Sequence, residues 1–193
     1  HLLKSPLGKF KPSTWKPQAI WTEPHNCSGS INHCPSGFTL QLTFQQDVQG
    51  YPDLPVRYII SNGGQNSRGN GYYIRQIRDK YFQIGVAKDT QLWQVELSLS
   101  WGGPTHLALA WSEEDGLKVY VDGFIAASAA QSAERVYTPV SVTPYREVTI
   151  GKANDEVYNG YPDVHIGTIS LTDSVISNQN VSALANTLTG ESV

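Results

Sequence analysis

The chain has 193 residues, of which 39% are hydrophobic and 16% are charged, and its formal net charge is −3. This length suits a single β-sandwich domain, and the weak charge balance argues against a nucleic-acid partner. No apolar run approaches the roughly 20 residues that a membrane-spanning helix needs. We therefore expect a domain that does not itself cross a membrane.

The N-terminal segment is rich in proline and shows little hydrophobic alternation. Residues 1–24 hold four of the 11 prolines, so we expect an extended arm over 1–18. A single domain follows over 19–193, with a short strand at Ala19–Trp21. An extended segment readily adds main-chain hydrogen bonds to a sheet edge, and one hypothesis is that the arm joins copies of the chain into a homo-oligomer.

The only two cysteines, Cys27 and Cys34, lie in a polar loop. A disulfide between them would close a small loop and stabilise the fold by roughly 2.5 kcal/mol. Two buried free thiols are the alternative, but the surrounding segment is too polar to bury them. A zinc site is a further alternative, because His25 and His33 are close in sequence, although it would need more ligands.

Two glycosylation sequons agree with a disulfide-permissive compartment. They place candidate glycans on Asn26, in Asn-Cys-Ser, and on Asn180, in Asn-Val-Ser. Together with the cysteine pair, they predict a secreted or cell-surface domain.

Short alternating runs separated by glycine-rich turns recur along the rest of the chain, as expected for an all-β sandwich. They cover residues 38–44, 56–61, 72–77, 81–86, 92–99, 148–151 and 166–171. The small-residue segment 126–134 suits either a short helix or an edge segment. A closing helical turn or two is expected within 178–188.

The stretch 106–123, HLALAWSEEDGLKVYVDG, predicts an antiparallel hairpin. Leu107, Leu109 and Trp111 share one face of its first run, and the second run alternates in the same way. The Asp-Gly pairs at 115–116 and 122–123 supply residues that tolerate positive φ, where each strand ends.

This hairpin resembles the corresponding stretch of pentraxin and laminin-G domains. Two further segments match in the right order: CPSGFTLQLTF at 34–44, and Ile150-Gly151 followed by HIGTISLTDSVIS at 165–177. The resemblance spans about residues 19–188. It implies a two-sheet antiparallel jelly-roll sandwich, of the concanavalin A-like and laminin G-like kind, similar to the N-terminal pentraxin-like domains of adhesion receptors.

The same resemblance implies calcium binding in many members. Where pentraxins carry a run of calcium-binding acids and amides, this chain has Lys-Ala-Asn-Asp-Glu over 152–156, so the central acid is missing. Calcium takes six to eight oxygen ligands, which Asn154, Asp155 and Glu156, with Asn70 from another loop, supply only in part. Calcium held by these residues and a solvated acidic turn without an ion both remain open.

Catalysis is not expected. Glycoside hydrolysis needs two carboxylates about 5–10 Å apart, but Glu113, Glu114 and Asp115 lie in the hairpin turn, where acidic residues are ordinary. No strand carries carboxylates at alternate positions. His106 opens a strand, and we expect it to make a local hydrogen bond rather than act as a base.

Five aromatic residues are candidates for contact with a partner: Trp101 at a strand end, Tyr158 and Tyr161 in a polar loop, and the adjacent pair Tyr72 and Tyr73. For Trp101, core packing is the favoured interpretation and contact with a partner is the alternative. The favoured hypothesis is a non-catalytic extracellular recognition or adhesion module that binds a protein or glycan through its loops. A calcium-assisted lectin and a structural subunit that assembles through its arm are the alternatives.

Overall fold

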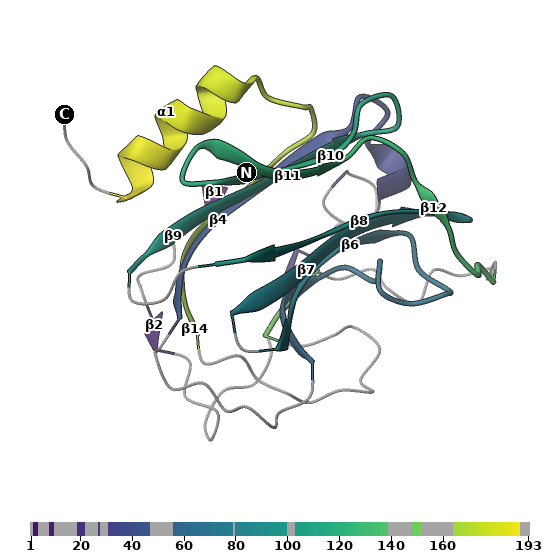
Figure 1. The fold of residues 1–193 in the computed structure, drawn as a ribbon, viewed down its shortest axis with the longest axis horizontal. Helices are drawn as coiled ribbons and strands as arrows, with labels where there is room; N and C mark the ends of the chain where they lie inside the picture. Colours follow the sequence, from purple (N-terminus) through teal and green to yellow (C-terminus); the bar gives the residue numbers. More distant parts are fainter. Residues whose placement is uncertain are drawn as a thin grey trace.

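The fold is an all-β sandwich of two antiparallel sheets with one α-helix outside them, as Figure 1 shows for the computed structural model. The predicted jelly-roll sandwich is thereby confirmed. The structure describes residues 2–3, 8–9, 19–21, 27, 31–46, 56–78, 80–99, 103–138, 148–151 and 164–189.

The first sheet has seven strands in the order β1-β14-β4-β9-β10-β11, and β2 also pairs with β14. Its strands are β1 (Leu2–Leu3), β2 (Gly8–Lys9), β4 (Phe38–Gln46), β9 (Thr105–Ser112), β10 (Gly116–Val121), β11 (Phe124–Ala129) and β14 (Val164–Thr172).

The second sheet also has seven strands, in the order β12-β8-β7-β6-β5-β13-β3. They are β3 (Ala19–Trp21), β5 (Arg57–Ser61), β6 (Gly71–Arg78), β7 (Tyr81–Lys88), β8 (Gln91–Ser98), β12 (Ala133–Glu134) and β13 (Val148–Ile150). A short 3-10 helix, η1 (Ile31–His33), and the helix α1 (Asn178–Thr189) complete the elements.

The predicted hairpin is formed by β9 and β10. Its register pairs Leu117 with Trp111 and Val119 with Leu109, so the alternating apolar residues share the core face. Gly116 ends the turn at a φ of 73°. After β10, Asp122 and Gly123 both have positive φ, as expected for the tight turn into β11.

The core lies between the sheets and is dominated by aromatic and branched side chains. Trp111 is 1% exposed, and its ring centroid lies 5.3 Å from that of Trp93 and 5.9 Å from that of Phe38. Burying each such side chain stabilises the fold by about 1.5–3 kcal/mol. The core therefore joins β4 and β9 of one sheet to β8 of the other.

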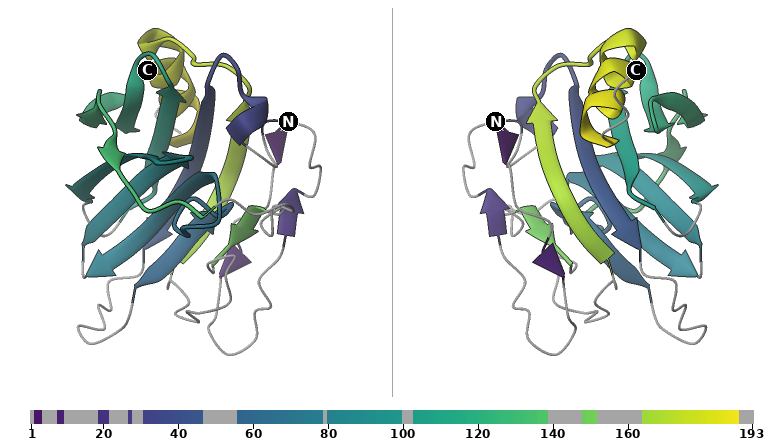
Figure 2. Two further views of the ribbon diagram at one scale, coloured as in Figure 1. Left: turned by 90° about the vertical axis from the view of Figure 1, so that its right-hand side faces the viewer. Right: turned by 90° about the vertical axis from the view of Figure 1, so that its left-hand side faces the viewer.

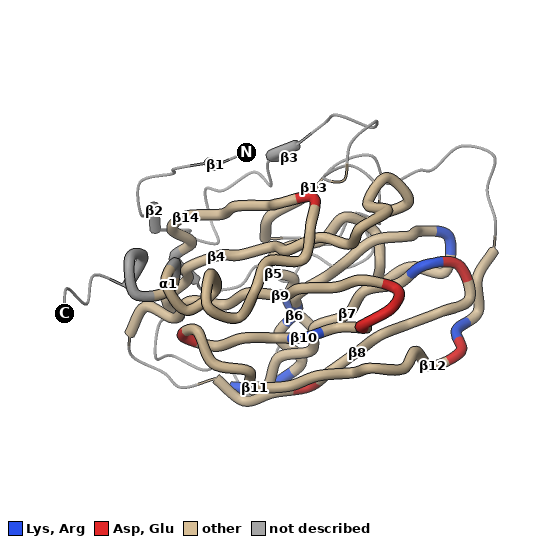
Figure 3. The backbone as a smooth tube through the Cα atoms, turned by 90° about the horizontal axis from the view of Figure 1, so that it is seen from above, with Lys and Arg blue, Asp and Glu red and all other residues tan. Residues whose placement is uncertain are grey.

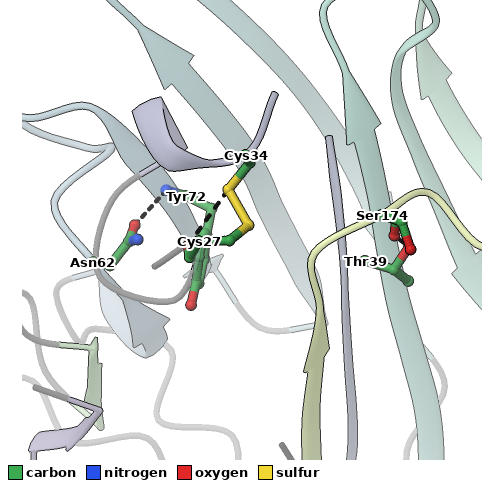
Figure 4. Close-up of a disulfide and its surroundings, with 6 residues drawn as sticks. All are labelled: Cys27, Cys34, Thr39, Asn62, Tyr72 and Ser174. Carbon is green, nitrogen blue, oxygen red and sulfur yellow. Dashed lines mark hydrogen bonds between the residues drawn. A yellow bond between two sulfur atoms is a disulfide. The ribbon is translucent and has the colours of Figure 1, made fainter. Parts of the chain in front are cut away.

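The disulfide between Cys27 and Cys34 is present, and their Cα atoms are 4.9 Å apart. Both cysteines belong to the same buried cluster as Tyr72 (Figure 4). Nearby, the backbone N–H of Tyr72 donates to Oδ1 of Asn62 at 2.6 Å. The predicted disulfide is confirmed, and it fixes η1 against the end of the core.

The N-terminal arm pairs with its own domain. Leu2–Leu3 and Gly8–Lys9 lie antiparallel to β14, and β3 lies antiparallel to β13. The described strands of the arm, β1 and β2, thus add main-chain hydrogen bonds to the edge of β14 in the same chain, and the pairing between copies stays a prediction.

Two segments resolve differently from the simplest expectation. Of the small-residue segment 126–134, residues 126–129 belong to the edge strand β11, which begins at Phe124, and residues 133–134 form β12. The closing helix has 12 residues rather than one or two turns. Ser177 caps it by accepting a hydrogen bond from the N–H of Asn180, and Val181 is buried against Tyr120 of β10.

Candidate binding face

The outer face of the second sheet carries a cluster of polar and aromatic side chains that we call the polar face. It consists of Tyr58, Tyr73, Arg75, Tyr81, Gln83, Gln94 and Glu96. These residues come from β5, β6, β7 and β8, at positions that alternate with core residues such as Ile74 and Ile84. The period of two along each strand places them together on the side away from the core.

One row of the polar face crosses four strands. Tyr58 pairs with Arg75, Arg75 with Gln83, and Gln83 with Glu96. Hydrogen bonds connect the row: Nη1 of Arg75 donates to the Tyr58 hydroxyl at 2.8 Å, and Nε of Arg75 donates to Oε1 of Gln83 at 2.8 Å. Nε2 of Gln83 then donates to Oε1 of Glu96 at 2.9 Å.

The next row depends on a missing side chain. Tyr73, Gly85 and Gln94 are paired across β6, β7 and β8. A Cβ on Gly85 would lie 2.4 Å from Cζ of Tyr73, so the tyrosine ring covers the glycine. This position lets the Tyr73 hydroxyl donate to Oε1 of Gln94 at 2.6 Å. Burial raises the pKa of Tyr73 to about 12, an effect that Arg75 opposes.

Aromatic rings hold the guanidinium at the centre of this face. The Cζ of Arg75 lies 5.0 Å from the ring centroid of Tyr73 and 5.7 Å from that of Tyr58, distances typical of cation–π contact. Arg75 is half-buried, while Gln94 and Glu96 are exposed. The face therefore combines a fixed guanidinium with accessible amide and carboxylate groups.

Tyr81 extends the polar face toward the end of β7. It is 37% exposed, and the guanidinium of Arg78 lies 4.6 Å from its ring centroid. Tyr81 pairs with Ser98, in the row next to Gln83 and Glu96. An exposed aromatic ring thus adjoins hydrogen-bonding groups on one surface.

A second polar cluster lies at the loops beside η1, and its centre is Asn70. This side chain is 6% exposed, and its Oδ1 accepts from the N–H of Asp89 at 2.8 Å and from Nη2 of Arg135 at 2.9 Å. Its Nδ2 donates to Oδ1 of Asp89 at 2.9 Å and to Oδ1 of Asn32 at 3.3 Å. These contacts use both N–H donors and both lone pairs of the oxygen of the amide.

Arg135 closes the loop between β5 and β6. Its guanidinium donates to the carbonyl oxygens of Asn66 at 3.0 Å, Gly69 at 2.8 Å and Asp89 at 2.7 Å. The chain after β12 therefore runs beside this loop, as the left view of Figure 2 shows. The cluster joins three loops and acts as a structural brace.

The predicted site residues fall into two groups. Asn70, Asn180, Tyr72 and Tyr73 are described. Asn70 is the centre of the brace, and Asn180 is exposed in the first turn of α1. Tyr72 lies in the core, whereas Tyr73 belongs to the polar face. The other predicted binding, calcium and glycosylation residues lie outside the described residues: Asn26, Trp101, Asn154, Asp155, Glu156, Tyr158 and Tyr161. Among the described residues, no group of three His, Cys, Asp or Glu side chains could hold a metal ion.

The acidic turn of the β9–β10 hairpin is exposed to solvent. Glu113 pairs with Lys88, and Oδ1 of Asp115 lies 3.3 Å from Nζ of Lys118. In Figure 3, acidic and basic stretches of the tube lie close together on the side of β7 and β12. The carboxylates engage lysines on the surface rather than facing each other across a cleft.

His106 differs from the expectation of a local side-chain hydrogen bond. Its backbone N–H donates to Oδ1 of Asp122 at 2.8 Å, but both ring nitrogens are buried without a hydrogen-bond partner in the described structure. Burial lowers the pKa of His106, while Asp122 opposes that effect. The imidazole is therefore held neutral inside the fold.

Sequence reasoning singled out Tyr73 but missed the rest of the polar face, because no short motif marks it. Its signal is distributed over the outward positions of three successive strands, where Tyr73 and Arg75, then Gln83, then Gln94 and Glu96 replace the usual small or solvated residues. Those positions become a cluster only when the strand register is known.

The structure is thus an antiparallel β-sandwich with a hydrogen-bonded polar face on its second sheet. Comparison with known proteins shows which solved structures share this fold. The sequence matches no protein family model and no curated protein. The resemblance to pentraxin and laminin-G domains therefore remains a prediction.

Among solved structures, the chain is similar to receptor-binding domains of botulinum neurotoxins. The binding domain of botulinum neurotoxin DC, in complex with rat synaptotagmin II, has a TM-score of 0.59 at 11% identity, over 82% of this chain and 37% of that chain. The ligand-binding domain of serotype D, in complex with N-acetylneuraminic acid, has a TM-score of 0.58 at 10% identity, over 79% and 36%. A type C structure, described by its dependence on two ganglioside molecules for cell entry, has a TM-score of 0.59 at 12% identity, over 79% and 36%.

These similarities concern the fold alone, because sequence identity is so low. The chain spans little more than a third of the length of each of these neighbours. In the described part of this chain, no helix is long and apolar enough to cross a membrane.

Proposed function

We propose that the chain is a non-catalytic recognition domain of an extracellular protein, and that its polar face binds a glycan. The observation that carries this proposal is a connected row across four strands, in which the buried side chains of Tyr58 and Gln83 hold the half-buried Arg75 and the exposed Glu96. The disulfide supports an extracellular location, since such bonds persist in oxidising compartments.

The chemistry of the polar face suits sugar hydroxyls. Glu96 and Gln94 present acceptors and a donor at the surface, and Arg75 presents a guanidinium whose geometry is already fixed by Tyr58 and Gln83. Such preorganisation reduces the entropy lost on binding. The partly exposed ring of Tyr81 adds an apolar surface next to these polar groups, a combination that suits the two faces of a sugar ring.

The structural neighbours support a binding role without specifying it. Their descriptions name synaptotagmin, gangliosides and N-acetylneuraminic acid as partners of the neurotoxin proteins. A sandwich of this kind can therefore occur in proteins whose role is recognition, and the ligand of this chain must be argued from its own surface.

A glycan array tests the proposal directly. We expect the chain to bind a defined subset of glycans, and Glu96→Gln to reduce that binding at least about tenfold by removing a charged acceptor. Glu114→Gln is the matched control, because Glu114 is an exposed carboxylate in the β9–β10 turn and lies outside the polar face. Absence of glycan binding, or equal loss in both variants, would contradict the proposal.

Calcium binding by Asn70, Asn154, Asp155 and Glu156 is a second proposal, which rests on the resemblance to pentraxin and laminin-G domains. The amide of Asn70 already makes four hydrogen bonds, so a calcium ion at its Oδ1 would have to displace Asp89 or Arg135. Thermal unfolding with calcium and with a chelator tests this proposal. A calcium-dependent rise in Tm that Asp155→Asn abolishes would support it, and identical Tm values would refute it.

A further inference from the structure

The sandwich covers its sheet edges unequally. Within the described residues, β1 and β2 cover the edge of β14, β3 covers that of β13, and β12 covers part of β8. Among the strands that the structure describes, none lies beyond β11 at the other edge of the first sheet. This difference singles out β11.

The start of β11 is also apolar and exposed. Phe124 is 78% exposed and Ile125 is 53% exposed, and the two are adjacent. No charged residue occurs from Phe124 to Ala133, so the chain is uncharged between Asp122 and Glu134 (Figure 3). An exposed apolar pair on an uncharged edge is a site for aggregation unless something covers it.

The N-terminal half of α1 lies against the turn between β10 and β11. The hydroxyl of Ser182 donates to the carbonyl oxygen of Gly123 at 2.7 Å, and a Cβ on Gly123 would lie 2.9 Å from Cα of Ser182. Ser182 is the third residue of the sequon that begins at Asn180. The sequon and the apolar pair are therefore joined by direct contact at Gly123.

Asn180 is oriented for attachment of a bulky group. Val181 is buried and Ser182 contacts the hairpin, whereas Asn180 is exposed. Three distances join Cα of Asn180 to Cα of Phe124: two residues of helix from 180 to 182, the contact between Ser182 and Gly123, and one residue of chain from Gly123 to Phe124. Together they place the two Cα atoms within about 14 Å of each other. A branched glycan of several sugars can reach across that distance.

We propose that Asn180 carries an N-linked glycan and that this glycan shields Phe124 and Ile125. In the attachment step, the amide nitrogen of Asn180 forms a bond to C1 of the first sugar of a lipid-diphosphate-linked oligosaccharide. The C1–oxygen bond to the lipid diphosphate breaks and the diphosphate leaves with its electron pair, while the amide proton passes to a base of the transferase. This inference rests on the extracellular location in the proposed function.

A glycan explains the open edge better than a second copy of the chain does. The register between β10 and β11 shifts between Val119 and Tyr120, which leaves Ala126 of β11 unpaired as a bulge. A bulge interrupts the outer ladder of an edge strand and hinders strand-to-strand pairing. A flexible polar glycan needs no regular ladder, and it lowers the exposure of the two apolar side chains while keeping the surface soluble.

The test is expression of the full chain in a glycosylating secretory host, followed by glycopeptide mapping. We expect a glycan on Asn180 and its loss in Asn180→Gln. We also expect Asn180→Gln to bind an apolar fluorescent dye and self-associate several-fold more than the wild type. Adding Phe124→Ser and Ile125→Thr to Asn180→Gln should return both signals to the wild-type level.

Asn26→Gln is the matched control, since it removes the other sequon. An unmodified Asn180 beside a modified Asn26 would overturn this inference and leave the extracellular location intact, whereas no modification at either residue would count against both. Unchanged dye binding and association after loss of the Asn180 glycan would overturn the shielding role. A dimer of the fully glycosylated chain that Phe124→Ser disrupts would overturn it as well.

Discussion

Replacing Gly85 with alanine tests how the polar face is built. The new Cβ would lie 2.4 Å from Cζ of Tyr73 and 2.5 Å from both Cε1 and Oη of the same side chain. Carbon atoms normally stay about 3.5–4.0 Å apart, so the tyrosine ring must move by roughly 1 Å. Gly85 does not adopt a positive φ, and alanine would therefore not strain the backbone itself.

The expected destabilisation follows from three contributions. Overpacking a well-filled site costs about 1–3 kcal/mol. Moving the ring also breaks the 2.6 Å hydrogen bond from Tyr73 to Gln94, and a buried hydroxyl without a partner costs about 1–3 kcal/mol. Alanine in a strand recovers about 0.5–1 kcal/mol relative to glycine. With the middle of each range, the net loss is about 3 kcal/mol, or roughly 6–12 °C in Tm for a chain of this size.

The assay is thermal and urea unfolding of Gly85→Ala, Tyr73→Leu and the double variant. The clash needs the Tyr73 ring, so Gly85→Ala should have little effect once Tyr73→Leu is present. Gly103→Ala is the matched control, because a Cβ there meets no atom within 4 Å. The reasoning would be refuted if Gly85→Ala were neutral or stabilising, or if its effect and that of Tyr73→Leu were additive.

Three further predictions concern the parts of the fold that support this face. Burial lowers the pKa of His106, so below about pH 6.5 the imidazole binds a proton in the unfolded chain but not in the folded chain. The free energy of unfolding should therefore fall as the pH drops below that value. His106→Leu should flatten this pH dependence in urea titrations from pH 7 to pH 5. Arg135→Met should destabilise the fold by about 2–3 kcal/mol and speed hydrogen exchange in the loop that Arg135 braces, because several loop carbonyls lose their donor; unchanged exchange would contradict the brace. The double variant Cys27→Ser and Cys34→Ser should lower the free energy of unfolding by about 2.5 kcal/mol. A reductant should lower the Tm of the wild type by as much as the two substitutions do. A wild-type Tm that does not change with reductant would contradict the role of the disulfide.

The strands and their faces could be predicted from the sequence because burial alternates with a period of two. Leu107, Leu109 and Trp111 lie in the core as that alternation indicates, and Gly116 and Gly123 end the strands with positive φ. The small segment after Gly123 was ambiguous, since alanine and serine suit both a helix and a strand. Its pairing with β10 decided the outcome.

The candidate site could be predicted only in part, for reasons of register. Asn70 was singled out for calcium, but its amide is used by Asp89, Asn32 and Arg135, which come from three other segments of the chain. No sequence spacing indicates that Arg135 reaches back to the loop before β6. The proposed loop ligands around Asp155 lie outside the described residues and remain a prediction.

The polar face depends on pairings between strands that local patterns do not reveal. Arg75 and Gln83 are adjacent only because β6 and β7 form a hairpin in one register, and a shift of one residue would place Arg75 opposite a core side chain. Gly85 has no meaning in the sequence alone beyond weakening a strand. In the fold it supplies the space that the Tyr73 ring fills.

The most direct test of the central claim is a crystal structure of the domain with the glycan that binds best on the array. The account predicts a sugar ring on the polar face, with its hydroxyl groups within hydrogen-bond distance of Gln94 and Glu96. A sugar bound at the loops around Asn70, with the polar face empty, would contradict it.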